Sequence, residues 1–331
     1  MIELRKDPIV RRWVIISSER SKRPMDFKKN VEEPETIFCP FDYGNEYSTP
    51  PEVLAFRDPS SKPNSSGWWL RVVPNKFPAL STEHELKKQG YGIYDKMTGY
   101  GYHEVIIETP EHNTSLAKMP ESQIKEIMWA YVKRFQEIRK DKNIKYIQIF
   151  KNKGREAGAT LSHPHSQLIA TPMVPITIRS EIEGANSYYD FRERCVFCDI
   201  ISQELTEKVR VVFKTKEFVV IEPYASRFPY ETWILPLKHS HDFGSIEANP
   251  PIVEDLAKAI SIIAKKFEKK IDDPPFNLVI HTAPFVEGLE IYYHWHIEII
   301  PRLTNIAGFE WGTGFNINHI APEQACADLI E

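Results

Sequence analysis

Two histidines and a glutamine alternate in residues 163–167, which read His-Pro-His-Ser-Gln. Alternate residues of a β-strand point to the same side, so His163, His165 and Gln167 are expected to form one polar row. Imidazole attacks phosphorus and also leaves it readily, so a histidine can carry a group from one phosphate to another. The row is therefore the main candidate for catalytic chemistry. The alternative for His165 is a hydrogen-bonded core histidine.

Cysteine and histidine spacing predicts a metal site in the second half of the chain. Cys195 and Cys198 form a Cys-x-x-Cys pair, and His239 and His294 follow at a distance. Two thiolates and two imidazoles are a common tetrahedral set for zinc. The alternative is that both cysteines are simply small buried residues.

A related set occurs in the first half: Cys39, Asp42, His112 and His163. An aspartate can bind zinc through oxygen, but a carboxylate in place of a thiolate weakens the selectivity for zinc. This set is therefore expected to hold zinc, to hold another metal or to remain empty.

The elements that must position these residues occur twice in the same order. In the first half, a strand at 103–108 precedes an amphipathic helix at about 120–140, a strand at 144–150 and the polar row. In the second half, a strand at 231–236 precedes a helix with an apolar stripe over 252–267, a strand at 276–281 and His294-Trp-His296. His112 and His163 are 51 residues apart, and His239 and His294 are 55 apart. This repetition predicts a duplicated domain.

Composition narrows the class of protein. The chain has 331 residues and a net charge of −4, which gives no sign of a nucleic-acid surface and favours a small-molecule partner. No run approaches the roughly 18 apolar residues of a membrane helix, and the first residues lack a signal-peptide core, so a cytoplasmic protein is expected. Four cysteines are too few and too unevenly placed for a disulfide scaffold.

Several separate motifs resemble the galactose-1-phosphate uridylyltransferase family, the double-domain branch of the histidine-triad superfamily, and most closely its plant-type ADP-glucose phosphorylase-like members. The resemblance covers nearly the whole chain. The motifs lie, in the family's order, at residues 12–17, 20–24, 39–41, 75–79, 108–112, 152–154, 163–167, 281–285 and 308–314. The resemblance implies an α+β fold with two tandem histidine-triad-like domains, each an antiparallel sheet covered by a long helix. The domains are expected at 1–182 (catalytic) and 183–331 (mainly structural and substrate-binding), with the join near 183–187.

The resemblance also implies roles in the polar row. His165 is the expected nucleophile, and His163 is a metal ligand at the end of the row. For His165 to attack, a backbone carbonyl must hold its other ring nitrogen. Histidine-triad hydrolases carry a third histidine at the position of Gln167. An amide cannot activate water, but it can donate hydrogen bonds to phosphoryl oxygens, so Gln167 favours a transferase over a hydrolase.

Substrate contacts follow from the same resemblance. The residues expected to bind the nucleotide, the transferred phosphate and the sugar are Arg20, Arg23, Asn75, Asn152, Phe309 and Trp311. A guanidinium fork suits phosphate oxygens. The alternatives are a solvated surface for the two arginines and core packing for the two aromatic side chains.

The second half carries His296 and Glu298 where the first carries His165 and Gln167, so no catalytic role is expected there. In bacterial family members, a second metal site corresponds to Glu181, His281, His296 and Glu298. That set competes with the Cys195 set for the same stretch, and the intact cysteine pair favours the latter. For Glu181, a solvated surface carboxylate is the preferred interpretation.

The main functional prediction is a UDP-glucose:hexose-1-phosphate uridylyltransferase that uses galactose 1-phosphate and a nucleotidyl-histidine intermediate. Gly308, Thr313 and Gly314 replace the Lys, Tyr and Glu of the family's hexose-binding loop, which leaves the acceptor open. The alternatives are an ADP-glucose phosphorylase, in which phosphate accepts the adenylyl group, and a non-catalytic nucleotide-sugar-binding protein. A homodimer is expected, with its active sites near the subunit interface.

Overall fold

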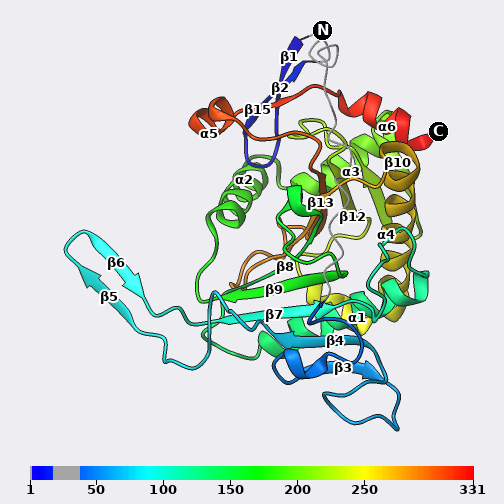
Figure 1. The fold of residues 1–331 in the computed structure, drawn as a ribbon. Helices are drawn as coiled ribbons and strands as arrows, with labels where there is room; N and C mark the ends of the chain where they lie inside the picture. Colours follow the sequence, from blue (N-terminus) through cyan, green and yellow to red (C-terminus); the bar gives the residue numbers. More distant parts are fainter. Residues whose placement is uncertain (1, 18–37) are drawn as a thin grey trace.

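The computed structural model describes residues 2–17 and 38–331. Its centre is a single ten-stranded antiparallel sheet that runs from β3 at the bottom of Figure 1 to β10 near the C-terminus. The strand order is β10-β11-β12-β14-β13-β8-β9-β7-β4-β3. The strands are β3 (Leu54–Arg57), β4 (Trp68–Pro74), β7 (Tyr102–Ile107), β8 (Tyr146–Lys153), β9 (His165–Thr171), β10 (Val211–Lys214), β11 (Phe218–Ile221), β12 (Thr232–Pro236), β13 (Phe276–His281) and β14 (His296–Pro301). The α+β prediction is confirmed.

The sheet consists of two five-stranded halves with the same connectivity. From the centre outwards, each half contains the fourth, fifth, third, second and first of its strands in sequence order: β8-β9-β7-β4-β3 on one side and β13-β14-β12-β11-β10 on the other. The halves meet where β8 pairs antiparallel with β13, from Ile149 opposite Ile280 to Lys153 opposite Phe276. The repeated order predicted from the sequence is therefore present, and the two copies share one sheet.

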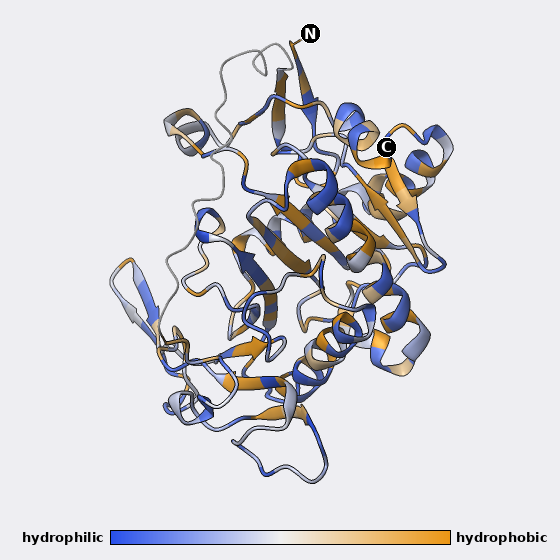
Figure 2. Cartoon of the chain, turned by 45° about the vertical axis from the view of Figure 1, so that its right-hand side comes forward, coloured by the Kyte–Doolittle hydropathy of each residue, from blue (hydrophilic) through white to orange (hydrophobic). Residues whose placement is uncertain are grey.

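Two long helices, α1 (Glu121–Ile138) and α4 (Pro250–Ile271), pack on one face of the sheet. Their apolar stripes are buried, including Ile124, Ile127 and Phe135 in α1 and Leu256 and Ile263 in α4. Both stripes belong to one hydrophobic core with the strands, which are mostly hydrophobic in Figure 2. Apolar residues spaced three and four apart drive this packing. The opposite face of the sheet carries two smaller hydrophobic clusters, which include Val105 and Ile107 of β7 and Val219 and Ile221 of β11.

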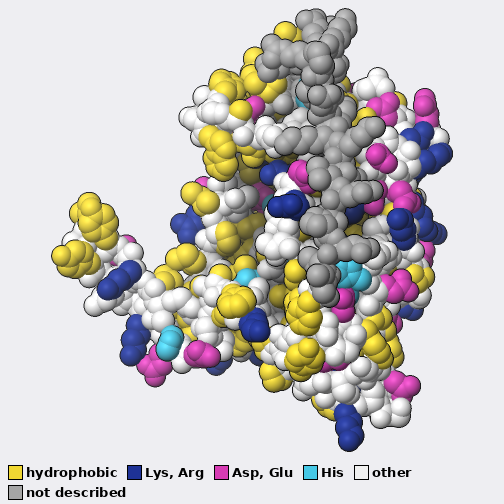
Figure 3. All heavy atoms as spheres, viewed as in Figure 1, with side chains coloured by type: hydrophobic (Ala, Val, Ile, Leu, Met, Phe, Trp, Pro, Cys, Tyr) yellow, Lys and Arg dark blue, Asp and Glu magenta, His cyan; other side chains and the backbone are white. Residues whose placement is uncertain are grey.

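Smaller elements surround this core. A three-stranded sheet contains β1 (Ile2–Lys6), β2 (Trp13–Ser17) and β15 (Asn316–Asn318). The hairpin of β5 (Lys88–Tyr91) and β6 (Tyr94–Met97) projects from the body, and exposed hydrophobic side chains cover its tip (Figure 3). The remaining helices are α2 (Ile176–Arg192), α3 (Val196–Glu207), α5 (Gly308–Thr313) and α6 (Pro322–Ile330).

Helix α2 links the two halves of the chain and contains residues 183–187, where the domain join was expected. Gly184 lets the helix approach the N-terminal segment closely, because a Cβ there would lie 1.9 Å from the carbonyl oxygen of Ile9. The domain boundary near residue 182 remains a prediction. Across the described residues, no helix is both long and apolar enough to cross a membrane.

Candidate active site and metal-binding clusters

The polar row lies at the start of β9, on the face of the sheet away from α1. Leu168 and Ala170 point into the core beneath α1, so His165 and Gln167 point the other way. Strand β7 runs alongside and places Ile107 opposite His165 and Val105 opposite Gln167. His163 precedes the strand and is fully buried. His165 and Gln167 are thus fixed by the sheet, whereas His163 lies just before it.

The ring of His165 is held in one tautomer. Its Nδ1 lies 2.8 Å from the carbonyl oxygen of His163, which can only accept, so Nδ1 carries the proton. Nε2 is left with a free electron pair. Burial lowers the pKa of His165, which keeps the imidazole uncharged near neutral pH. This is the arrangement that a histidine nucleophile needs.

A pocket of about 300 Å³ opens on this face. Among its lining residues are His165, Gln167, Asn75, Phe41 and Phe77. The structure therefore brings Asn75, which was predicted from a separate motif, to the same pocket as His165 and Gln167. A larger pocket of about 430 Å³ lies between the N-terminal segment, α2 and the end of α5, and its described lining residues include no histidine or cysteine.

A buried ion pair lies behind β9, the strand that carries His165. Lys151 Nζ donates to Glu108 Oε2 at 2.7 Å and to the carbonyl oxygen of His165 at 3.1 Å. Glu108 is fully buried and Lys151 is 5 % exposed. The sequence did not predict this pair, although Glu108 ends one predicted strand and Lys151 directly follows another. The pair fixes the backbone that carries His165.

Other predicted substrate residues lie elsewhere or outside the described structure. Arg20 and Arg23 fall within the residues that are not described. Asn152 accepts a hydrogen bond from Asn277 at 2.8 Å across the join of β8 and β13, and it is not among the pocket-lining residues. Phe309 and Trp311 lie on α5 and are exposed, and they do not line the His165 pocket of their own chain. Their contacts with substrate remain predictions.

The first candidate metal cluster contains one thiol, one carboxylate and two imidazoles: Cys39, Asp42, His112 and His163. One ligand atom from each lies within 4.8 Å of the others. Asp42 Oδ1 is 2.6 Å from Nδ1 of His112 and 3.0 Å from Nδ1 of His163. Burial raises the pKa of Asp42, but the two histidines outweigh it and the pKa is lowered. Nε2 of His163 donates to the carbonyl of Thr109 at 2.8 Å, which leaves Nδ1 free for a metal.

The second cluster contains two thiols and two imidazoles: Cys195, Cys198, His239 and His294. Sγ of Cys198 lies 3.3 Å from Nδ1 of His239 and 3.7 Å from Nδ1 of His294. The Nε2 atoms of these histidines donate to the carbonyls of Glu290 and Pro236, at 2.7 and 3.0 Å. Hydrogen bonding, first from Cys198 and then from the histidines, lowers the pKa of Cys195. In both clusters the histidines turn Nδ1 inward. A backbone carbonyl holds Nε2 in His163, His239 and His294, and the hydroxyl of Ser162 holds Nε2 in His112 at 3.0 Å, as outer partners of metal-binding histidines usually do.

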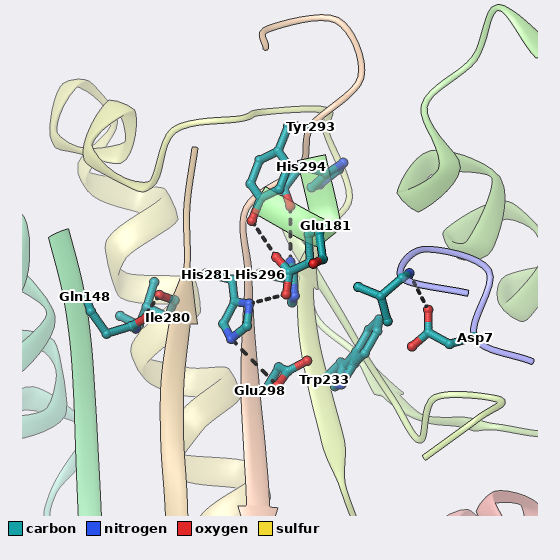
Figure 4. Close-up of polar contacts among 12 residues, drawn as sticks. Asp7, Gln148, Glu181, Trp233, Ile280, His281, Tyr293, His294, His296 and Glu298 are labelled. Atoms are coloured by element: carbon teal, nitrogen blue, oxygen red, sulfur yellow. Dashed lines mark hydrogen bonds and ion pairs between the residues drawn. The ribbon is translucent and has the colours of Figure 1, made fainter. Parts of the chain in front are cut away.

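A third cluster consists of Glu181, His281, His296 and Glu298, and ion pairs of His281 hold it together (Figure 4). His281 Nδ1 is 2.7 Å from Glu181 Oε1, and His281 Nε2 is 3.7 Å from Glu298 Oε2. Tyr293 donates to Glu181 at 2.8 Å, and Arg227 contacts Glu298 at 2.5 Å. Burial lowers the pKa of His281, but the two carboxylates outweigh it and raise the pKa to about 9. One ligand atom from each of Glu181, His281 and His296 lies within 4.8 Å of the others, as in the first two clusters. Here, however, both nitrogens of His281 face carboxylates and Arg227 pairs with Glu298, an arrangement that suits an ion-pair network.

The structure corrects two interpretations that were drawn from the sequence. Glu181 is not a solvated surface carboxylate, because it is 6 % exposed and bonded to His281 and Tyr293. The third and second clusters also do not compete, since they share no residue: His294 turns to the cysteines and His296 turns to His281. Alternate residues of one short segment thus serve two neighbouring clusters.

Comparisons with known proteins identify the family to which this chain is similar. The model of the galactose-1-phosphate uridyl transferase N-terminal domain matches residues 2–175, and that of its C-terminal domain matches residues 181–325. An ADP-glucose phosphorylase of Arabidopsis thaliana is 39% identical over 99% of this chain and 92% of its own length. A galactose-1-phosphate uridylyltransferase of Thermotoga maritima is 30% identical over 100% of this chain and 98% of its own length.

Solved structures give the same answer. The crystal structure of an Arabidopsis thaliana ADP-glucose phosphorylase with bound ADP-glucose matches with a TM-score of 0.84 and 36% identity, and covers 100% of this chain and 99% of that one. The agreement of both family models, full-length relatives and fold extends over both halves of the chain. The chain belongs to the galactose-1-phosphate uridyl transferase family and is a nucleotidyltransferase of that family.

Proposed function

We propose that this chain transfers a nucleotidyl group from a nucleotide sugar to a phosphate through a covalent intermediate on His165. The proposal rests on one observation: Nδ1–H of His165 donates a hydrogen bond to the carbonyl oxygen of His163 at 2.8 Å. The attacking atom is then Nε2, on the wall of a pocket that also contains Gln167 and Asn75. The lowered pKa of His165 supports attack at neutral pH.

The reaction consists of two displacements at the α-phosphorus. Nε2 forms a bond to phosphorus while the bond to the bridging oxygen breaks, and the sugar 1-phosphate leaves with that electron pair. An oxygen of the acceptor phosphate then attacks, and the P–N bond breaks to return the electron pair to Nε2. The amide of Gln167 would donate to phosphoryl oxygens in both steps, and it cannot remove a proton from water.

We favour ADP-glucose as the donor and inorganic phosphate as the acceptor. The relative named ADP-glucose phosphorylase is 39% identical, whereas the Thermotoga maritima uridylyltransferase is 30% identical, and each match spans nearly the whole chain. Gly308, Thr313 and Gly314 also lack polar side chains long enough to bind a second hexose. UDP-glucose with galactose 1-phosphate is the second candidate, supported by both family models.

Zinc is the proposed metal. Two thiols and two Nδ1 atoms in the second cluster match its usual tetrahedral ligands. Asp42 replaces one thiol in the first cluster, so zinc is expected to bind more weakly there. Zinc would cross-link distant segments of the chain at both clusters. In the first cluster it would fix His163, whose carbonyl orients His165.

A homodimer and a cytoplasmic location are also part of the proposal. Phe309 and Trp311 are exposed on α5 and outside the His165 pocket of their own chain. This position suits a role in which the aromatic side chains face the pocket of a second copy. The oligomeric state can be measured by sedimentation of the purified protein.

The decisive experiment is the intact mass of the protein after incubation with ADP-glucose or UDP-glucose. We expect an AMP adduct that inorganic phosphate discharges, and no adduct in His165→Ala. His84→Ala, which changes an exposed histidine, is the matched control and should label like the wild type. A UMP adduct that galactose 1-phosphate discharges would replace the first candidate with the second. Binding without any adduct would leave a nucleotide-sugar-binding protein.

A further inference from the structure

We propose that His103 orients the side-chain amide of Gln167 and thereby decides which of its two polar atoms faces the transferred phosphate. His103 lies on β7, two residues before Val105, which is opposite Gln167. The inference rests on the proposed function, because it assigns a positioning residue to the same reaction.

The tautomer of His103 follows from a backbone contact. The N–H of Ala79 donates to Nδ1 of His103 at 3.0 Å. A backbone N–H can only donate, so Nδ1 must carry an electron pair. In a neutral imidazole the single proton is then on Nε2. His103 is therefore a hydrogen-bond donor at Nε2, in the opposite tautomer to His165.

The side chain of Gln167 accepts the hydrogen bond from this Nε2–H group. Its Oε1 lies 2.7 Å from Nε2 of His103. Nδ2 of Asn75 lies 3.1 Å from the same nitrogen, but Oδ1 of Asn75 already accepts from the N–H of Phe77 at 2.9 Å. Asn75 thus presents its amino group to His103 and cannot accept. With Oε1 of Gln167 committed, its NH₂ group is the polar atom left to face the pocket.

The orientation matters because phosphoryl oxygens only accept hydrogen bonds. The two ends of a glutamine amide have nearly the same shape, so sterics alone do not choose between them. A reversed amide would turn Oε1 towards the phosphate oxygens and would place an NH₂ against the Nε2–H of His103. The fixed proton on His103 excludes that arrangement.

The second half of the chain lacks this pair. The positions that correspond to His103 and Gln167 by strand register are Glu231 and Glu298, since Trp233 is opposite Glu298 as Val105 is opposite Gln167. Arg227 joins the two carboxylates at 2.7 and 2.5 Å. Of these two corresponding pairs, only the one beside His165 contains a histidine that donates to an amide.

Three substitutions separate positioning from folding. His103→Gln places an amide nitrogen near the former Nε2 and can still donate to Gln167. His103→Asn keeps an acceptor for the N–H of Ala79 but is too short to reach Gln167. His103→Glu presents only acceptors and favours the reversed amide. All three are compared in the full-length protein by single-turnover formation of the nucleotidyl adduct, with the KM for the nucleotide sugar and the melting temperature.

We expect His103→Asn to slow adduct formation roughly 10- to 100-fold at saturating nucleotide sugar, as for other residues that orient a catalytic group. His103→Gln should recover most of the rate, and His103→Glu should be the slowest. The KM should change little. In the wild type, ¹⁵N spectra of labelled histidine should assign a protonated Nε2 and an unprotonated Nδ1 to the signal that His103→Asn removes.

The possible failures are distinguishable. If the wild type forms no adduct with ADP-glucose or UDP-glucose, the proposed function fails. If the wild type forms an adduct and His103→Asn forms it equally fast, the positioning role of His103 is overturned. A protonated Nδ1 in the wild type, or equal loss of rate in the Gln and Asn variants with a raised KM, would also overturn it and indicate a role in shaping the pocket.

Discussion

Trp233 occupies in the second half of the sheet the position that Val105 occupies in the first. Val105 is opposite Gln167, and Trp233 is opposite Glu298. The larger side chain covers His296, with the two ring centroids 5.2 Å apart. Phe197 covers the same imidazole at 5.1 Å, and His296 is 1 % exposed. The second histidine keeps the backbone contact of a nucleophile, to His294 at 3.1 Å, but has no room for a phosphate.

Because Trp233 and Phe197 cover His296, we expect that His296 takes no part in nucleotidyl transfer. His296→Phe should form the nucleotidyl adduct at a rate within about twofold of the wild type, because the adduct forms on His165. His165→Ala should form none, although His296 is intact. Intact mass after exposure to ADP-glucose measures both, normalised to folded protein. An adduct in His165→Ala that disappears on adding His296→Phe would show that the second half reacts.

The ion pair of Lys151 and Glu108 behind β9 should contribute strongly to stability. Lys151→Met would leave Glu108 buried without a cation, which we expect to lower the free energy of unfolding by about 3–5 kcal/mol. The matched control is Lys151→Met with Glu108→Gln, which removes both charges and should recover part of the loss. Urea unfolding measures the free energy. Equal losses in the single and double variants would mean that charge pairing is not the cause.

Local patterns were enough to predict several of the regular elements. The strand expected at 276–281 is β13, and the helix expected at about 120–140 is α1 at Glu121–Ile138. Both follow from the spacing of apolar residues along a short segment. The polar row and the two Cys/His clusters were predictable for the same reason, since their residue types are rare and their spacing repeats.

Contacts between distant segments were not predictable in this way. The pairing of β8 with β13 joins residues such as Asn152 and Asn277, which are 125 positions apart and carry no shared pattern. Glu181 resembles a surface carboxylate until α2 folds against His281. The role of His103 depends on a proton that is placed by the backbone of Ala79. Such groups acquire their function from tertiary partners.

The two metal clusters should differ in affinity. Cys198→Ser should lower the zinc content by about one ion per chain and reduce the melting temperature, because it removes a thiolate from the second cluster. Asp42→Ala should release zinc from the first cluster at lower chelator concentration than the second cluster requires. Elemental analysis after graded chelation measures both. Cys326→Ser, a buried cysteine outside both clusters, is the control and should keep its metal.

The cluster of Glu181 and His281 should behave as an ion-pair network. Glu181→Gln removes the charge that faces His281, and we expect the free energy of unfolding to fall by about 1–3 kcal/mol. The metal content should stay at the wild-type level, since both nitrogens of His281 face carboxylates. Elemental analysis and urea unfolding of the same sample test this. A parallel loss of one metal ion would identify the cluster as a metal site instead.

Stability should decline towards alkaline pH because of Glu222. This carboxyl is fully buried, and burial raises its pKa well above the ordinary 4.5. Oε1 accepts from Thr232 at 2.6 Å, whereas Oε2 has no hydrogen-bond partner among the described residues. The neighbouring acidic groups are Glu231, Tyr230 and Cys326. The backbone carbonyl of Arg210 accepts from the N–H of Glu222, but the guanidinium of Arg210 donates to Glu204, Glu207 and Glu323. The ionised form of Glu222 is therefore uncompensated.

The sign of the effect follows from linkage. The folded protein holds the proton of Glu222 above pH 4.5 more tightly than the unfolded chain does. The stability that this group contributes is therefore fully present below about pH 4.5, and it is lost as the pH rises through the raised pKa of the folded state. Glu222→Gln cannot ionise, so it should gain roughly 1–3 kcal/mol over the wild type at pH 8 and much less at pH 5. Glu247→Gln, an exposed control, should show the same small difference at both values. If Glu222→Gln is no more stable than the wild type at pH 8, the ionised carboxylate has a cation that compensates it.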